Sequence, residues 1–352
     1  MIAAVIALAG CDAGSTTIRA EWPDAVTAGK PIAFPLGFDR ISSYVATSDS
    51  TGLVADATSR RLVLVDWTDG TLTDLVRDGA GPGEVGGLSA LVAVPGGAAM
   101  LDHRQRQLMH FRSDGSVAEE LRMDSLPLGV ELRGADQAGR YYFEWRGIRR
   151  AAVPDSAYLL RWQPGSGADT IGRVLSPPMR SIELVRGTSR NTMLFAVPYA
   201  AQDLWAAAPD GRLAALRGSG PRLELVSASG SSELGPVLAV PPGALSQADR
   251  DSARIPEELR QDLQWPDVLP PFTGQLSWCQ DSELLIAPVS TSIGSAPSIL
   301  LLKSTGEPLA VMRLELGERM VGCSRGLLFT AVTDQQELER LRRRRLPEVD
   351  EN

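Results

Sequence analysis

A unit of about 44 residues recurs along this chain of 352 residues. Two copies show it clearly, because 50–56 (STGLVAD) and 96–102 (GGAAMLD) each place a tight turn before a short apolar strand. A second apolar strand follows in each copy and ends in an Asp-Gly pair, Asp69-Gly70 or Asp114-Gly115, which is a strong hairpin signal. Internal repeats of this length indicate a fold in which each copy forms one supersecondary unit.

The turn position of the unit occurs six times, at intervals of 45, 42, 72, 71 and 44 residues. The six positions are Gly52, Gly97, Gly139, Gly211, Ser282 and Gly326. Intervals near 44 fit one four-stranded blade each, and the two long intervals predict insertions around Ser176–Asn191 and Ala244–Pro271. Short strands between Gly- and Pro-containing turns argue against a helical solenoid. The sequence therefore predicts an all-β, six-bladed β-propeller with four-stranded antiparallel blades over residues 30–346.

The sixth unit lacks a fourth strand. Its three segments lie at 319–323, 327–331 and 338–346. The stretch 30–38 (KPIAFPLGF) precedes the first blade and belongs to none of the six units. An open propeller would expose edge strands that invite aggregation. We therefore expect the N-terminal strand to close the last blade, so that deleting residues up to Phe38 strongly lowers the melting temperature.

Two further segments carry local predictions. In the second insertion, Ser246 to Asp249 followed by 256–260 (PEELR) is typical of one short capped helix. Near the C-terminus, Glu and Arg residues recur at helical spacing from Asp334 to the run Arg342–Arg345, so a helix is possible by composition. Its place in the sixth blade favours a strand with a solvated face instead.

The N-terminus predicts export. Residues 1–10 form an apolar run too short to cross a bilayer as a helix, and they end in Leu8-Ala9-Gly10-Cys11. This motif resembles the lipobox of bacterial lipoproteins, although no Lys or Arg precedes Cys11. The resemblance implies cleavage of a signal peptide, 1–10, and a lipid on Cys11 that anchors the protein to a bacterial membrane outside the cytoplasm. The alternative is a buried N-terminal strand with a chance cysteine. Residues 11–29 would form a linker and 347–352 an acidic tail.

A family resemblance supports the predicted fold. The loop Gly79–Glu84 (GAGPGE), Asp102 and Asp114-Gly115 together resemble the NHL-like six-bladed propellers, many of which are lipoproteins of environmental bacteria. Later stretches are similar to that group as well: Val197–Tyr199, Leu204-Trp205, Pro209–Gly211 and Trp265–Phe272. The resemblance covers about residues 30 to 346. It implies the fold and says almost nothing of function, because propellers host many unrelated activities.

Composition disfavours several function classes. The net charge of −8 argues against nucleic-acid binding through a basic surface. The two histidines, His103 and His110, and the single internal asparagine, Asn191, are too few for a metal site or for the axial constellation of propeller enzymes. We therefore predict no catalytic, metal or cofactor site. Asp56 and Asp102 fall at repeated strand ends, as does Asp66, which indicates hydrogen bonding in turns.

The expected function is a scaffold that binds a protein, peptide or glycan; the alternative is a hydrolase or lyase with its site at the axial mouth. Turns on one predicted face carry a set of arginines that could receive an anionic ligand. These candidate ligand-binding residues are Arg60, Arg104, Arg146, Arg149 and Arg217. The competing interpretation is that arginine is simply the usual surface cation of a chain with only two lysines.

Cys279 and Cys323 occupy matching places, each three residues before the turn position of its unit. They should lie on inner strands of adjacent blades, near the axis where blades approach most closely. A disulfide requires Cα atoms within about 7 Å, so both a bridge and two buried thiols remain open.

Overall fold

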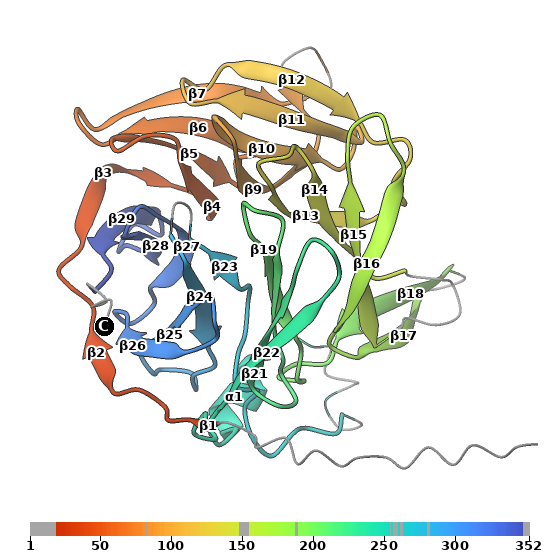
Figure 1. The fold of residues 1–352 in the computed structure, drawn as a ribbon, viewed down its shortest axis with the longest axis vertical. Coiled ribbons are helices and arrows are strands. Elements are labelled where there is room, and N and C mark those ends of the chain that lie inside the picture. Colours follow the sequence, from red (N-terminus) through yellow and green to blue (C-terminus); the bar gives the residue numbers. More distant parts are fainter. Residues whose placement is uncertain are drawn as a thin grey trace, which may run out of the picture.

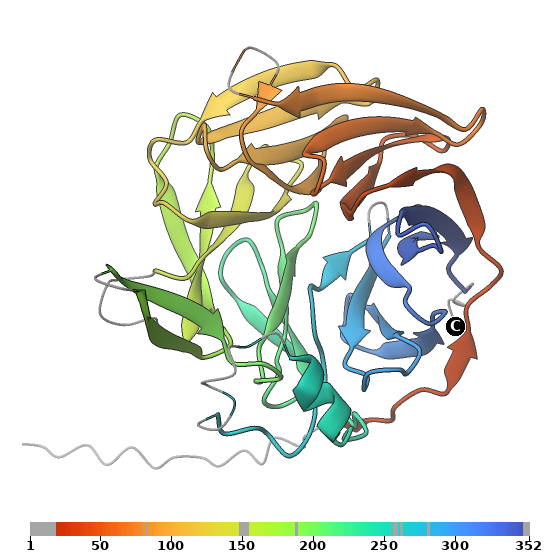
Figure 2. The same ribbon diagram turned by 180° about the vertical axis from the view of Figure 1, so that it is seen from behind.

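Six β-sheets surround a common axis in the computed structural model of the protein (Figures 1 and 2). The structure describes residues 19–347 except for 80, 82–83, 148–154, 187–188, 254, 256–259, 261–262 and 280–281. Each sheet forms one blade, and a separate two-stranded hairpin projects from the ring. The predicted six-bladed propeller is confirmed.

The blades follow one another in chain order, each from its inner strand outward. Blade 1 contains β4 (Ile41–Ala46), β5 (Thr51–Asp56), β6 (Arg61–Asp66), β7 (Thr71–Asp78) and β8 (Glu84–Val85). Blade 2 contains β9 (Leu88–Val94), β10 (Gly97–Asp102), β11 (Gln107–Arg112) and β12 (Val117–Arg122). Blade 3 contains β13 (Val130–Ala135), β14 (Tyr141–Trp145), β15 (Ser156–Trp162) and β16 (Ala168–Leu175).

The second half of the ring also uses strands from the N-terminus. Blade 4 contains β19 (Leu204–Ala207), β20 (Leu213–Leu216), β21 (Arg222–Val226), β22 (Ser232–Leu238) and β1 (Arg19–Ala20). Blade 5 contains β23 (Ser277–Trp278), β24 (Leu284–Val289), β25 (Ser298–Lys303), β26 (Pro308–Arg313) and β2 (Ala25–Thr27). Blade 6 contains β27 (Arg319–Ser324), β28 (Leu327–Thr333), β29 (Glu339–Arg345) and β3 (Ile32–Phe38).

The core lies between the blades. Six apolar clusters each join residues of two neighbouring blades, including one that joins blade 6 to blade 1. A strand in the middle of a blade is therefore covered on both faces, and every residue of β10 is buried. The outer strand β12 is almost entirely exposed. Continuous apolar runs in the middle strands and polar outer strands are the sequence pattern that this arrangement requires.

The N-terminal strand closes the ring as predicted. β3 pairs antiparallel with β29, from Phe38 opposite Glu339 to Ile32 opposite Arg343. Phe34 and Phe38 enter the cluster between blades 6 and 1. Gly52 allows Tyr44 to pack closely in this cluster, because a Cβ atom at position 52 would lie 2.2 Å from the hydroxyl of Tyr44.

Part of the predicted linker, 11–29, also pairs with the propeller. β1 runs parallel to β22, and β2 runs parallel to β26, so blades 4 and 5 each gain a fifth outer strand. β8 adds a similar parallel strand to blade 1. The predicted four antiparallel strands thus form the body of every blade, and three blades carry a short parallel addition that covers an open edge.

Both long repeat intervals contain insertions. β17 (Met179–Arg186) and β18 (Ser189–Ala196) form the projecting hairpin after blade 3. The helix α1 (Gln247–Ser252) follows blade 4 and begins at Ser246, whose side chain forms a capping box with Asp249, as predicted. Residues 256–259, the second half of that prediction, lie outside the described residues. The Tyr199 hydroxyl donates to the Asp249 carbonyl at 2.9 Å and links the two insertions.

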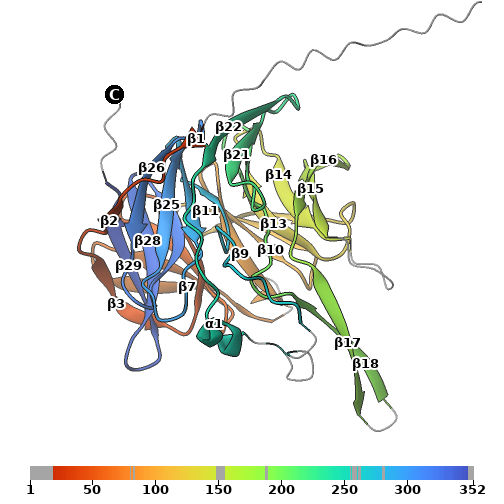
Figure 3. The same cartoon turned by 90° about the horizontal axis from the view of Figure 1, so that it is seen from below.

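The two faces of the ring differ. We call the face that carries α1 and the hairpin the insertion face (Figure 3). The opposite face, called the terminal face, holds both ends of the described chain. Figure 3 draws β1 on this side, away from α1, and β29 ends there at Arg345.

Candidate functional site

A cavity of about 710 Å³ lies on the propeller axis and opens on the insertion face. The inner strand of every blade contributes to its wall, for example through Ser43, Leu91, Arg133, Ala206, Ser277 and Cys323. The two insertions add residues at the rim, namely Pro177, Tyr199, Gln202, Leu269, Thr273 and Gln275. A cavity of this size fits a small molecule or a short stretch of a larger one.

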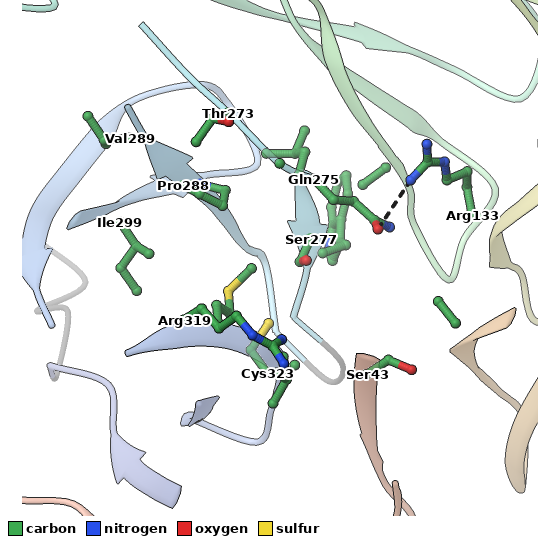
Figure 4. Close-up of a pocket in the computed structure, with 18 of the residues that line it drawn as sticks. Ser43, Arg133, Thr273, Gln275, Ser277, Pro288, Val289, Ile299, Arg319 and Cys323 are labelled. Atoms are coloured by element: carbon green, nitrogen blue, oxygen red, sulfur yellow. Dashed lines mark hydrogen bonds between the residues drawn. The ribbon is translucent and has the colours of Figure 1, made fainter. Parts of the chain in front are cut away.

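The wall of this insertion-face cavity is mostly aliphatic, with a few convergent polar groups. Pro288, Val289 and Ile299 line one side, and two arginines, Arg133 and Arg319, approach from inner strands of different blades (Figure 4). Apolar walls with a small number of placed polar groups are typical of ligand sites.

Arg133 is positioned by a carboxylate network below the cavity wall. Its guanidinium lies 2.8 Å from Glu131 and 3.0 Å from Glu144, and it donates to the side-chain carbonyl of Gln275 at 3.3 Å (Figure 4). Glu144 is buried and also accepts a hydrogen bond of 3.0 Å from the Trp205 indole. The Nε atom of Arg133 is buried without a hydrogen-bond partner. The arginine is thus held in place while one donor stays unused.

Arg319 joins the last blade to the first. Its guanidinium donates to both carboxylate oxygens of Glu339, at 2.6 and 2.8 Å, and to the carbonyl of Ile41. Glu339 also accepts from the Ile41 backbone N–H at 2.6 Å. These three hydrogen bonds of Arg319 use one terminal nitrogen, its side chain is 41% exposed, and it lines the cavity.

Glu318 is the one carboxylate among the described lining residues, and its oxygens are already engaged. Arg344 binds it through two contacts of 2.5 and 2.6 Å, Thr330 donates to it, and it accepts from the Glu315 backbone N–H. All three side chains of this cluster are buried. Glu318 therefore neutralises a buried cation and is unsuited to acid–base chemistry on a ligand.

Four of the arginines predicted to bind an anion lie in the described part of the chain, and none of these four lines this cavity. Arg60 pairs with Asp78 at 3.0 Å, Arg146 lies 3.5 Å from Glu144, and Arg217 contacts Asp203 and Glu224 at 2.6 and 2.5 Å. Arg104 is exposed, and Arg149 lies outside the described residues. Because turn residues on a propeller sit far from the axis, each described arginine instead finds local partners or solvent. Anion binding by this set stays a prediction.

The other candidate groups serve the fold. Asp102 is fully buried and accepts hydrogen bonds from the backbone N–H groups of Gly86, Arg104 and Gln105 at 2.7 to 3.0 Å. Asp56 does the same for Asp39 and Arg40, both at 3.1 Å. These contacts fix the turns that join one blade to the next, as the repetition indicated.

The two histidines are far from the axis wall. His103 is exposed in a turn, whereas the imidazole of His110 shares a 2.8 Å hydrogen bond with the hydroxyl of Tyr141. Burial lowers the pKa of His110. Within residues 19–347, no group of three or more His, Cys, Asp or Glu side chains could hold a metal ion, outside the short gaps named above.

Cys279 and Cys323 form a disulfide with a Cα–Cα separation of 5.0 Å. Cys279 directly follows β23, and Cys323 lies on β27, so the bond joins the inner strands of blades 5 and 6. Cys323 lines the cavity (Figure 4). Of the two arrangements that the spacing allowed, the structure contains the bridge. Cys11 lies outside the described residues, and in the described part of the chain no helix is long and apolar enough to span a bilayer.

Comparisons with known proteins agree on architecture. No protein-family model matches the chain, and neither does any curated protein. Among solved structures, a protein of Bacteroides fragilis predicted to be exported superposes with a TM-score of 0.56 at 13% identity, covering 94% of this chain and 99% of its own. A member of the duf4221 family from Bacteroides vulgatus gives 0.53 at 9% identity, with 90% and 96% covered. Virginiamycin B lyase from Staphylococcus aureus gives 0.44 at 12% identity, with 90% and 99% covered. The two Bacteroides proteins share the fold, and at identities this low they show no more.

Sequence reasoning missed the residues that matter most in the cavity. Arg133, Glu318 and Arg319 carry no motif, and nothing in the sequence distinguishes them from other charged residues on strands. One usable signal existed: Arg133 and Arg319 both lie on the first strand of a repeat unit, and first strands line the axis of a propeller.

Proposed function

We propose that this protein is an exported, lipid-anchored propeller that binds a peptide, a segment of a protein or a glycan in the insertion-face cavity. The observation that carries the proposal is the cavity wall: all six blades contribute to it, it is mainly apolar, and it includes the two arginines Arg133 and Arg319. Such a site recognises shape together with an anionic or hydrogen-bonding group. The insertions extend the rim and enlarge the contact area for a polymer.

Export and anchoring rest on two independent features. The motif Leu8-Ala9-Gly10-Cys11 matches the lipobox pattern, and the Cys279–Cys323 disulfide suits an oxidising compartment. β1 lies on the side of the terminal face (Figure 3), so a lipid on Cys11, eight residues before Arg19, would hold that face toward the membrane. Eight residues span at most about 28 Å. The insertion-face cavity would then point away from the bilayer, open to a ligand.

Replacing Cys11 with serine is expected to move the protein from the membrane fraction to the soluble fraction. The hydroxyl cannot form the thioether that carries the lipid, and the described residues contain no spanning helix to replace it. Fractionation of cells followed by immunoblotting measures this. Full retention of the Cys11→Ser variant in membranes would refute lipid anchoring at this residue.

The cavity is tested by removing its two arginines. Full-length protein is crosslinked in membranes of the native bacterium, purified, and its bound proteins and glycans are identified by mass spectrometry. We expect Arg133→Ala/Arg319→Ala to recover the specific ligand at least tenfold less well, which corresponds to about 1.4 kcal/mol or more of binding free energy.

The matched control is Arg60→Ala/Arg104→Ala, which removes two arginines from turns on the same face but away from the cavity. It should recover the ligand as the unmodified protein does. Equal recovery by all three proteins would overturn the assignment of this cavity. If only the control variant loses the ligand, the turn arginines bind it and the cavity arginines do not. Equal melting temperatures of the purified variants establish that any loss reflects binding.

A further inference from the structure

A second, larger cavity of about 1140 Å³ lies on the terminal face. Blades 1, 3, 4, 5 and 6 contribute to its wall, which differs from that of the insertion-face cavity because it is rich in cations and aromatic rings. The cations are Arg212, Lys303, Arg325, Arg343 and Arg345, and the rings are those of Tyr44, Trp67, Trp278 and Phe329. Tyr44 and Trp278 line both cavities and so lie between them.

The arginines of β29 divide into two sets by the alternation of the strand. Arg340, Arg342 and Arg344 each bind a carboxylate, with contacts of 2.6 Å to Asp334, 2.5 Å to Glu315 and 2.5 Å to Glu318. Arg343 and Arg345 point to the other face of the strand and line the terminal-face cavity. Among the described residues, neither of these two guanidiniums forms an ion pair with a carboxylate.

The carboxylates of this cavity pair with two of its other cations, Arg212 and Arg325. Asp210 and Glu283 contact Arg212 at 2.6 and 3.2 Å, and Asp49 pairs with Arg325. Arg343 instead lies over the ring of Trp67, with its guanidinium carbon 4.6 Å from the ring centroid. A cation on an aromatic face keeps the edges of its guanidinium open to a further anion.

We propose that the terminal-face cavity binds a phosphate ester, whose phosphate group is held between Arg343 and Arg345. Residues two apart on a strand have Cα atoms about 6.6 Å apart, so their guanidiniums can reach one tetrahedral group from the same side. A phosphate monoester offers three free oxygens and about two negative charges, enough to bind both guanidiniums, whereas two oxygens of a carboxylate saturate one. The cavity is far larger than phosphate alone, and Trp67 and Trp278 provide apolar surface for the organic part.

Such a phosphate ester could be a lipid headgroup or a soluble metabolite, and the same two arginines would bind either. β1 also lies on the side of the terminal face (Figure 3), so a headgroup at a nearby bilayer could reach the cavity. The site itself depends on neither lipid anchoring nor the proposed function of the insertion-face cavity.

The test measures binding of two probes that share one phosphate monoester. Full-length protein is titrated with glycerol 3-phosphate by calorimetry, and its sedimentation is measured with phosphatidylcholine vesicles that do or do not contain phosphatidic acid. We expect Arg343→Gln/Arg345→Gln to weaken binding of the recognised probe at least tenfold, and Arg343→Lys/Arg345→Lys to weaken it less, because lysine keeps the charge but loses bidentate contacts.

The control variant Arg122→Gln/Arg173→Gln removes the same charge from exposed positions on outer strands of blades 2 and 3 and should bind as the unmodified protein does. Each experiment is repeated with Glu348→Gln/Asp350→Asn/Glu351→Gln, which removes the carboxylates that follow β29 in the sequence; the effect of the arginine pair must persist in that background. Binding of vesicles alone identifies a headgroup site, and binding of glycerol 3-phosphate identifies a soluble ester. The proposal fails if neither probe binds, if glycerate binds as tightly as glycerol 3-phosphate, or if the Arg343→Gln/Arg345→Gln variant binds like the control.

Discussion

A chain that begins at Asp39 should show no cooperative unfolding transition, and the double variant Phe34→Ala/Phe38→Ala should come close to the same result. Both phenylalanines are 1% exposed and pack between blades 6 and 1. Truncating a buried phenylalanine costs about 3 to 5 kcal/mol, so the pair costs about 6 to 10 kcal/mol. Whole domains are stable by only about 5 to 15 kcal/mol. Calorimetry or urea unfolding followed by tryptophan fluorescence measures the loss.

The same strand supplies the control. Leu36 lies between the two phenylalanines and is 44% exposed, so Leu36→Ala should change stability by no more than about 0.5 kcal/mol. A chain that begins at Lys30 loses β1 and β2 but keeps β3, and it should still unfold cooperatively. If the chain beginning at Asp39 melts at the same temperature as the full chain, the ring does not depend on β3 and the closure drawn from the sequence is irrelevant to stability.

The sequence predicted the ring because each blade repeats the same local chemistry. A turn glycine, an apolar strand and an Asp-Gly hairpin recur whether or not the neighbouring blade is known, and the missing strand of the sixth unit left one place for 30–38. The parallel strands β1 and β2 were not foreseen, because segments of two and three residues are too short to show alternation.

The candidate site was predicted much less well, for a geometric reason. Which side chain of an inner strand turns toward the axis depends on the tilt of the blade, and no local pattern encodes that tilt. The turn arginines were plausible from position, yet Arg60 and Arg217 have nearby acids that the linear sequence does not place beside them. The alternation along β29 shows the opposite case: once the strand is known, the face on which each arginine lies follows from its position, and among the described residues the arginines of one face pair with carboxylates.

Removing the Cys279–Cys323 bridge should lower the free energy of unfolding by about 4 kcal/mol. The bond closes a loop of 44 residues that spans most of blade 5, and the chain-entropy relation for a loop of this length gives that value. The loss of unfolding free energy affects the whole ring, because blades 5 and 6 must stay together for the N-terminal strand β3 to close blade 6. Urea unfolding of Cys279→Ala/Cys323→Ala against the oxidised protein measures it.

Reduction separates loss of the crosslink from loss of packing. Dithiothreitol should shift the unmodified protein to nearly the urea midpoint of the double variant, and it should leave the double variant unchanged. Cys279 is fully buried, so substitution alone also removes some packing, and the small remaining difference between the two proteins measures that part. If dithiothreitol reduces the bond, as alkylation and mass spectrometry would show, and the midpoint does not move, then interblade packing alone holds blades 5 and 6 together. In that case the cavity wall at Cys323 needs no covalent support. The bridge would then form only because the protein folds in an oxidising compartment.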